Sequence, residues 1–229
     1  KKNEVYITVD CDPNIQREIS EFFTFYVPGY KFMPAFRNRM WDGKIRLFSQ
    51  KTKEIYFGLF PYIKAFAEER QYHIVCGKDV EIDNKVDKDV VAKFSNSLGQ
   101  KFEARDYQID AIYHSLKHNR ALLLSPTASG KSFIIYSLIR YYSHLIKDET
   151  NNRILLIVPT TSLVEQMYSD FQSYGWNVKK NCHRLYSGYS NQTDKKVLIS
   201  TWQSLYKLPK TYFEQFGCVF GDEAHLFKS

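Results

Sequence analysis

The chain has 229 residues, of which 44% are hydrophobic and 25% are charged, and Lys plus Arg outnumber Asp plus Glu by 32 to 25. This length exceeds the ~100 to 200 residues of one domain, so we expect two domains, and the net charge of +7 favours a phosphate-rich partner. The four cysteines form no C-x-x-C pair, and no apolar run approaches the ~18 to 20 residues that cross a bilayer. These features argue against a zinc ribbon, a disulfide framework and a membrane protein, and we expect a cytoplasmic protein.

The first elements read as a small α+β unit. Residues Val5–Asp10 alternate like a strand, and Pro13–Phe25 predicts a helix with Asp12 as its N-cap and Pro13 in its first turn. Pro28 and Gly29 predict a turn. Further along, the expected elements are a strand at Glu54–Phe57, a helix at Pro61–Glu69 and a short strand at His73–Cys76.

Between Tyr30 and Lys53 basic and aromatic residues are interleaved, and Asp42 is the one acid. Cations neutralise phosphates and exposed rings stack on unpaired bases, so this stretch predicts a nucleic-acid surface. The alternative is that the rings form the core of a small domain. The residues expected to contact nucleic acid are Arg37, Arg39, Trp41, Lys44 and Arg46.

The acidic segment Lys78–Asp89 and the polar stretch Ser95–Gly99 interrupt this pattern, so we place the domain boundary near residue 98, between domains 1–98 and 99–229. Beyond it, short apolar runs alternate with helical stretches, which predicts an α/β domain with a mostly parallel sheet. The runs expected to form strands are Ala121–Leu124, Ile154–Val158, Val197–Ile199 and Cys218–Phe220.

A strand, a tight loop and a helix are expected in succession at Leu122–Leu124, Ser125–Ser132 and Phe133–Ile139. Backbone N–H groups at a helix N-terminus attract phosphates, so this context predicts a phosphate-binding loop. We expect Lys131 to reach the terminal phosphates of ATP and Ser132 to ligate Mg²⁺. The loop residues expected around the phosphates are Thr127, Ala128, Ser129 and Gly130.

The pattern G-x-x-x-x-G-K-[ST] is met except at its first position, where Ser125 replaces glycine. An ordinary strand–helix turn is the alternative for this segment alone. A second signal follows the apolar run Cys218–Phe220, where Asp222 and Glu223 stand side by side. A carboxylate at a strand end next to a phosphate loop can hold Mg²⁺, and its neighbour can orient and deprotonate a water. We assign these roles to Asp222 and Glu223 in that order, although such a pair alone is more often a solvated turn.

The segment Asp222-Glu223-Ala224-His225 resembles the DEAH form of the Walker B motif of superfamily 2 helicases, which implies a RecA-like fold and adds His225 to the catalytic set. Arg105-Asp106-Tyr107-Gln108 resembles the adenine-reading Q motif. The amide of Gln108 can donate to and accept from an adenine edge, and Arg105 joins it as a nucleotide contact. A surface glutamine on a helix is the alternative.

Two further segments match the superfamily in order. Pro159–Gln166 resembles motif Ia, and Ile199–Leu205 resembles the motif that follows it. The resemblance implies that Thr160, Thr161 and Thr201 contact the phosphates of the tracked strand, since hydroxyl and N–H groups at a helix start suit phosphate oxygens. Plain N-capping is the alternative for either segment.

The whole chain resembles the N-terminal half of the UvsW-type recombination helicases of T-even phages, with Ala224 where we expect Cys. The resemblance implies ATP- and Mg²⁺-driven remodelling of branched or forked DNA or RNA–DNA hybrids, by a monomer, in the host bacterial cytoplasm if phage-encoded. It also implies a second RecA-like domain that this chain lacks, so we expect weak ATP binding and slow hydrolysis. The segments that carry it are Tyr30–Phe32, Phe36–Arg37, Trp41–Leu47, Phe57–Leu59, the phosphate loop, Ile157–Thr161 and Thr201–Gln203.

Two other readings are open. Among ATP-driven motor proteins, an RNA helicase or the motor subunit of a restriction system would carry the same motifs. In a different class, a non-catalytic nucleic-acid-binding module would keep a vestigial nucleotide site. The intact Lys131, Ser132, Asp222 and Glu223 argue against the last reading.

Overall fold

The computed structural model describes residues 5–77, 80, 85–145 and 152–227, which fall into two compact units, 1–83 and 84–229. Each unit has its own core. Among the helices of these described residues, none is long and apolar enough to span a membrane.

The first unit is α+β, as expected. Strands β1, β5 and β4 form an antiparallel sheet in that order, and β2 and β3 form a separate antiparallel ribbon. Ile7, Ile55, Phe48 and Phe66 are buried between the sheet and the helices. The elements are β1 (Tyr6–Thr8), α1 (Pro13–Phe22), β2 (Thr24–Tyr26), a 3-10 turn (Tyr30–Phe32), α2 (Pro34–Arg37), β3 (Lys44–Arg46), β4 (Phe48–Ser49), β5 (Glu54–Tyr56), a 3-10 turn (Phe57–Leu59) and α3 (Phe60–Glu69).

Two local expectations for this unit were wrong. Helix α1 ends at Phe22 because the next residues pair as β2 with β3. Its start is as predicted, since Asp12 is the N-cap residue and Pro13 occupies the first turn, although the Asp12 side chain makes no capping hydrogen bond. Residues His73–Cys76 form no strand, since an alternating run becomes a strand only where a neighbouring strand accepts its hydrogen bonds.

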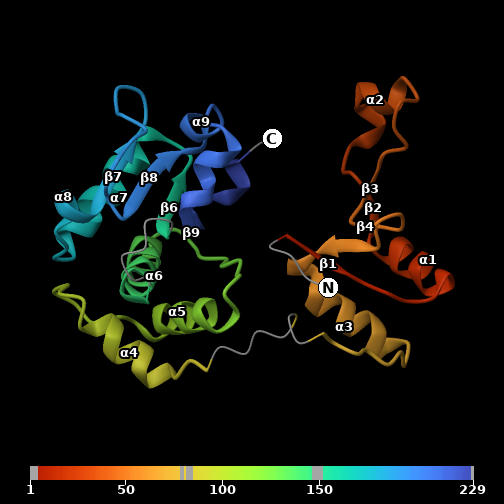
Figure 1. Cartoon of the computed structure of the whole chain (residues 1–229), viewed down its shortest axis with the longest axis horizontal. Coiled ribbons are helices and arrows are strands. Elements are labelled where there is room, and N and C mark those ends of the chain that lie inside the picture. The colour runs from red at the N-terminus through yellow and green to blue at the C-terminus, as the bar shows by residue number, and fades with distance from the viewer. Residues whose placement is uncertain (1–4, 78–79, 81–84, 146–151, 228–229) are drawn as a thin grey trace. The chain divides into compact units, whose positions relative to one another are not determined.

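The second unit is built on a parallel sheet with strand order β7-β8-β6-β9, which confirms the predicted α/β class (Figure 1). Side chains of β6 alternate between its two faces. Ile154, Leu156 and Val158 pack with helices α6 and α7, whereas Leu155 packs with Leu205 of α9 on the other face. The elements are α4 (Lys88–Asn96), α5 (Asp106–His118), α6 (Lys131–Leu145), β6 (Arg153–Val158), α7 (Thr161–Ser173), α8 (Val178–Asn181), β7 (Cys182–Leu185), β8 (Val197–Thr201), α9 (Trp202–Leu205), a 3-10 turn (Lys210–Gln215), β9 (Phe216–Gly221) and a 3-10 turn (Ala224–Leu226).

Two features of this unit differ from the expectation. Residues Ala121–Leu124 form no strand, and Leu122 and Leu124 are 79% and 91% exposed. The apolar run predicts an extended segment, but among the described residues it does not pair with β9, which is the edge strand of the sheet. Strand β7 was not predicted, because its sequence Cys-His-Arg-Leu is mixed in polarity.

Helix α4 belongs to the second unit, so the division falls between Asp83 and Asn84 and not near residue 98. Val91 of α4 is 1% exposed and packs against Ile112 and Leu116 of α5. The polar stretch that suggested a boundary, Ser95–Gly99, is the end of this helix and the turn after it, and its residues Ser95 and Leu98 are buried.

Candidate nucleotide and nucleic-acid site

The phosphate-binding loop leads directly into α6, so Lys131 and Ser132 occupy the first two positions of that helix. Ala128 and Gly130 have left-handed φ angles of 64° and 80°. A Cβ atom on Gly130 would lie 2.3 Å from the side-chain nitrogen of Gln108, so both the backbone and the close approach require glycine there. The loop places the N-terminus of a long helix, with its unpaired N–H groups, where phosphates would lie.

The acidic pair follows β9 at the carboxyl edge of the sheet. Asp222 extends the β9–β6 ladder, since its backbone N–H donates to the carbonyl of Ile157 at 2.9 Å. The Lys131 ammonium donates to Glu223 Oε1 and forms an ion pair with it. His225 Nδ1 lies 3.5 Å from the other oxygen of Glu223. Residues 92 positions apart therefore meet at one point, as the two motifs predicted.

Lys131 and the two carboxylates perturb one another. The hydrogen bond from Lys131 lowers the pKa of Glu223, and the same bond raises the pKa of Lys131. Asp222 is only 6% exposed, and burial raises its pKa although the charge of Lys131 opposes that shift. A buried carboxylate that has lost much of its hydration is a suitable ligand for a divalent cation, whose charge would stabilise the ionised form.

Gln108 lies in the site, but its side-chain amide makes hydrogen bonds to other residues of the protein. It is 5% exposed, its side-chain nitrogen donates to the carbonyl of Ser129 at 3.0 Å, and its side-chain oxygen accepts from the N–H of Arg105 at 3.0 Å. The Tyr107 hydroxyl donates to the same Ser129 carbonyl at 3.0 Å. In this arrangement Gln108 links the phosphate-binding loop to the start of α5. The sequence had predicted instead that its amide contacts adenine.

Two tyrosines in the site were not predicted. Tyr107 lies inside the quoted Q-like motif, is 44% exposed and accepts a hydrogen bond from Arg105 at 3.1 Å. Tyr174, at the end of α7, shares a hydrogen bond of 2.9 Å with the Ser132 hydroxyl. No sequence pattern signals Tyr174. A groove of about 600 Å³ borders the loop and leaves room for a nucleotide base, and its lining includes Tyr107, His114, Leu124 and Pro126.

The threonines of the two later motifs lie at the same carboxyl edge. Val158 pairs with Thr201, and Ile157 pairs with Gly221, so the loops after β6, β8 and β9 start side by side. Thr160 caps α7 by accepting from the N–H of Leu163 at 3.3 Å. Thr201 is 4% exposed and shares a hydrogen bond of 2.9 Å with Ser204. Thr161, in the first turn of α7, is exposed.

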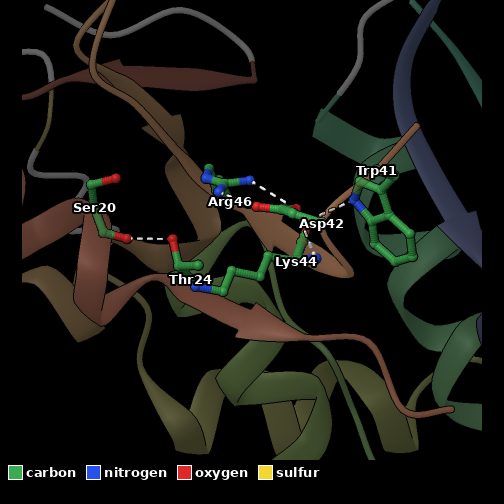
Figure 2. A network of polar contacts seen from close by, with 6 residues as sticks. All are labelled: Ser20, Thr24, Trp41, Asp42, Lys44 and Arg46. Atoms are coloured by element: carbon green, nitrogen blue, oxygen red, sulfur yellow. Dashed lines mark hydrogen bonds and ion pairs between the residues drawn. The ribbon is translucent and has the colours of Figure 1, made fainter. Parts of the chain in front are cut away.

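The candidate residues of the first unit lie on the segment between β2 and β3 and on β3 itself. Arg37 and Arg39 are exposed, whereas Arg46 is paired with Asp42 (Figure 2). The Trp41 indole N–H donates to the carbonyl of Lys44 at 2.8 Å, so this ring closes the turn. The Lys44 ammonium lies 4.9 Å from the centre of the Tyr26 ring.

Each of the two units matches a known protein family. Residues 101–229 match the family model described as "Type III restriction enzyme, res subunit", and residues 2–77 match "DNA helicase UvsW, N-terminal". The ATP-dependent DNA helicase uvsW of Enterobacteria phage T4 is 34% identical over 230 residues, which cover 96% of this chain and 45% of that protein. This chain therefore spans about half the length of that relative.

Two crystal structures of the phage T4 UvsW helicase are also similar. One has a TM-score of 0.85 and 32% identity, with 98% of this chain and 81% of that chain covered. The other has a TM-score of 0.84 and 33% identity, with 96% of this chain and 46% of that chain covered. The similarity extends through both units.

Proposed function

Because this chain belongs to the family of the res subunit of type III restriction enzymes and corresponds to the N-terminal region of a UvsW-type superfamily 2 helicase, we propose that it is the ATP-binding front half of a DNA helicase or translocase. Its substrates in this proposal are branched DNA and RNA–DNA hybrids, in fork regression, junction migration and R-loop unwinding. The protein acts as a monomer.

One observation carries the proposal, which is the meeting of Lys131 with Glu223 beside the buried Asp222. An ammonium at a helix N-terminus and two adjacent carboxylates suit a magnesium nucleotide and suit little else. Lys131 binds the terminal phosphates after it leaves Glu223, and Glu223, once released, orients and deprotonates the attacking water. His225, next to Glu223, helps to fix that carboxylate.

The residues present fit Mg²⁺ and ATP. Ser132 and Asp222 would hold the ion together with phosphate oxygens, and residues Thr127 to Gly130 would surround the phosphates. Within the described ranges, no group of three or more His, Cys, Asp or Glu side chains could hold a metal without a further ligand. When bound, the ion neutralises charge on the phosphates. Arg105 and Gln108 would act on the nucleotide from the start of α5, Gln108 through its bond to Ser129.

DNA contacts are proposed in both units. Thr160 and Thr161 offer hydroxyl and N–H groups at the start of α7, and Thr201 positions the neighbouring loop. In the first unit, the positive charge that attracts DNA phosphates comes from Arg37, Arg39, Lys44 and Arg46. Trp41 contributes by holding their turn in shape.

The chain spans 45% of the length of its phage T4 relative, and we propose that efficient turnover needs a second RecA-like domain from the rest of such a protein. In that arrangement ATP lies between the two domains. The 229-residue chain alone would bind ATP weakly and hydrolyse it slowly.

The test is ATP hydrolysis by the full-length protein with forked DNA, linear duplex DNA and single-stranded RNA. Forked DNA should stimulate most, and Lys131→Ala and Glu223→Gln should each reduce stimulated kcat by about 10² to 10³-fold, as loss of one key electrostatic group does in other enzymes. Greatest stimulation by RNA or by linear duplex would favour an RNA helicase or a restriction motor. Unchanged function in both variants would point to a non-catalytic binding module.

A further inference from the structure

The segment between β2 and β3, residues 27–43, folds into a small lobe whose rings have different roles. Tyr30 stacks on Tyr26 with ring centres 4.7 Å apart and meets Phe36 edge-on at 4.8 Å. Trp41 is held by its hydrogen bond to Lys44 (Figure 2). These aromatic side chains hold the lobe together, so its fold explains them without any ligand.

Two large apolar side chains of the lobe remain outside this packing. Phe32 is 85% exposed and Met40 is 75% exposed. Neither exposure contributes to the stability of the lobe, because burial is what stabilises an apolar side chain. Such side chains on a charged surface are typical of a binding site.

A groove of about 600 Å³ lies on the same lobe, and cations dominate its lining. Arg39 has a left-handed φ of 57°, a backbone conformation that is uncommon for a residue other than glycine. The one carboxylate, Asp42, is neutralised by Arg46 at 2.5 Å (Figure 2), which also lowers its pKa. The lining residues are Lys31, Phe36, Arg37, Arg39, Met40, Trp41 and Asp42.

We propose that this lobe binds unpaired nucleotides, with bases stacked on Phe32 and packed against Met40, and with phosphates on Lys31, Arg37 and Arg39. The inference rests on the proposed function, in which DNA is the ligand of the first unit. Charge complementarity identifies a polyanion, and the exposed ring and thioether select unpaired strands because the bases of a duplex already stack on each other. The lobe therefore recognises the single-stranded part of a fork.

The experiment measures binding of the 229-residue chain to a fluorescent single strand and to a duplex of equal length, by anisotropy at fixed salt. Phe32→Ala and Met40→Ala should each weaken single-strand binding by on the order of 10-fold, as loss of one stacking or packing contact does, and should change duplex binding by less than about 2-fold. Tyr62→Ala is the matched control, since Tyr62 is 61% exposed on α3 and lies outside the lobe.

A second measurement distinguishes stacking on the Phe32 ring from nonspecific apolar binding. A 2-aminopurine placed in the single strand should change its fluorescence when the chain binds, and Phe32→Leu, which keeps an apolar side chain but removes the ring, should abolish that change. Equal losses for single strand and duplex, or no loss in Phe32→Ala, would overturn the inference. Either result leaves the proposed function intact if Lys131→Ala still removes DNA-stimulated hydrolysis by the full-length protein, whereas absence of that hydrolysis would reject the proposed function itself.

Discussion

Asp222 and Glu223 are adjacent in the sequence, but they occupy opposite electrostatic environments. Asp222 is buried at the end of β9, where loss of hydration raises its pKa. Glu223 receives the Lys131 ammonium, which lowers its pKa. Two carboxyl groups whose pKa values are pushed apart are suited to different tasks, one as a cation ligand and one as a base. The contact between Lys131 and Glu223 must also open before phosphates can bind Lys131.

At this scale we predict that Asp222→Asn raises the melting temperature at pH 7 while it abolishes ATP hydrolysis. A folded-state pKa above the ordinary 3.8 means that ionisation of Asp222 opposes folding, so its cost is absent at low pH and grows as the pH rises above that value. Melting curves from pH 3 to pH 8 should therefore show the variant gaining on the wild type as the pH increases. A lower melting temperature at pH 7 would contradict this account.

Glu223→Gln serves as the matched variant and should behave in the opposite way. A folded-state pKa below the ordinary 4.5 means that ionised Glu223 stabilises the fold, and this contribution disappears as the pH falls through the lowered pKa. The variant should therefore be less stable than the wild type at pH 7 and equal to it in acid. Parallel shifts of both variants would indicate a general packing effect.

At the scale of elements, the lobe between β2 and β3 depends on one close approach. Gly43 has a φ of 80°, and a Cβ atom there would lie 2.3 Å from Cδ2 of the Tyr30 ring. Its carbonyl also accepts from the N–H of Val27 at 2.9 Å, which joins the two ends of the lobe. The turn, the ring packing and the ribbon pairing are therefore coupled at this glycine.

Gly43→Ala should disrupt the lobe, and Gly29→Ala is its matched control. Gly29 has a similar φ of 74° but nothing within 4 Å of the added atom. The control should lose about 1 to 2 kcal/mol from left-handed strain alone. Gly43→Ala should lose roughly 1 to 3 kcal/mol more because it also displaces Tyr30. Urea unfolding measures both, and equal losses would show that the ring moves aside freely.

At the scale of the whole molecule, each unit has its own core, and α4 decides where the second begins. Besides the burial of Val91, Lys88 forms an ion pair with Asp110 of α5. Leu98, just after α4, is 6% exposed in the main core of this unit. The second unit therefore includes residues that look like a linker in the sequence.

A fragment of residues 84–229 should accordingly be more stable than one of residues 99–229. The shorter fragment loses the buried side chains of Val91 and Leu98, at about 1.5 to 3 kcal/mol each. Thermal unfolding of the two purified fragments measures the difference. Equal melting temperatures would instead support the expectation that the second domain begins near residue 98.

Features that depend on local order along the chain could be predicted from the amino-acid sequence. These features are the glycine and lysine at the start of a helix, the acidic pair after an apolar strand and the alternation of strands with helices. Each depends only on residues that are close together in the sequence. They were sufficient to predict that Lys131 and Glu223 meet and that the sheet is parallel. Parallel strands bring their carboxyl ends to one edge, so motifs far apart in the sequence converge there.

Which side chains are free to bind a ligand could not be predicted in this way, because it depends on long-range packing. Gln108 matches an adenine-reading pattern but is bonded to Ser129 and Arg105, and Trp41 matches a stacking pattern but closes a turn. The apolar run ending at Leu124 is exposed and pairs with no strand among the described residues. The physical reason is common to all three, because hydrogen bonding and burial depend on partners distant in the chain, and a local pattern specifies the side chain but not the partner.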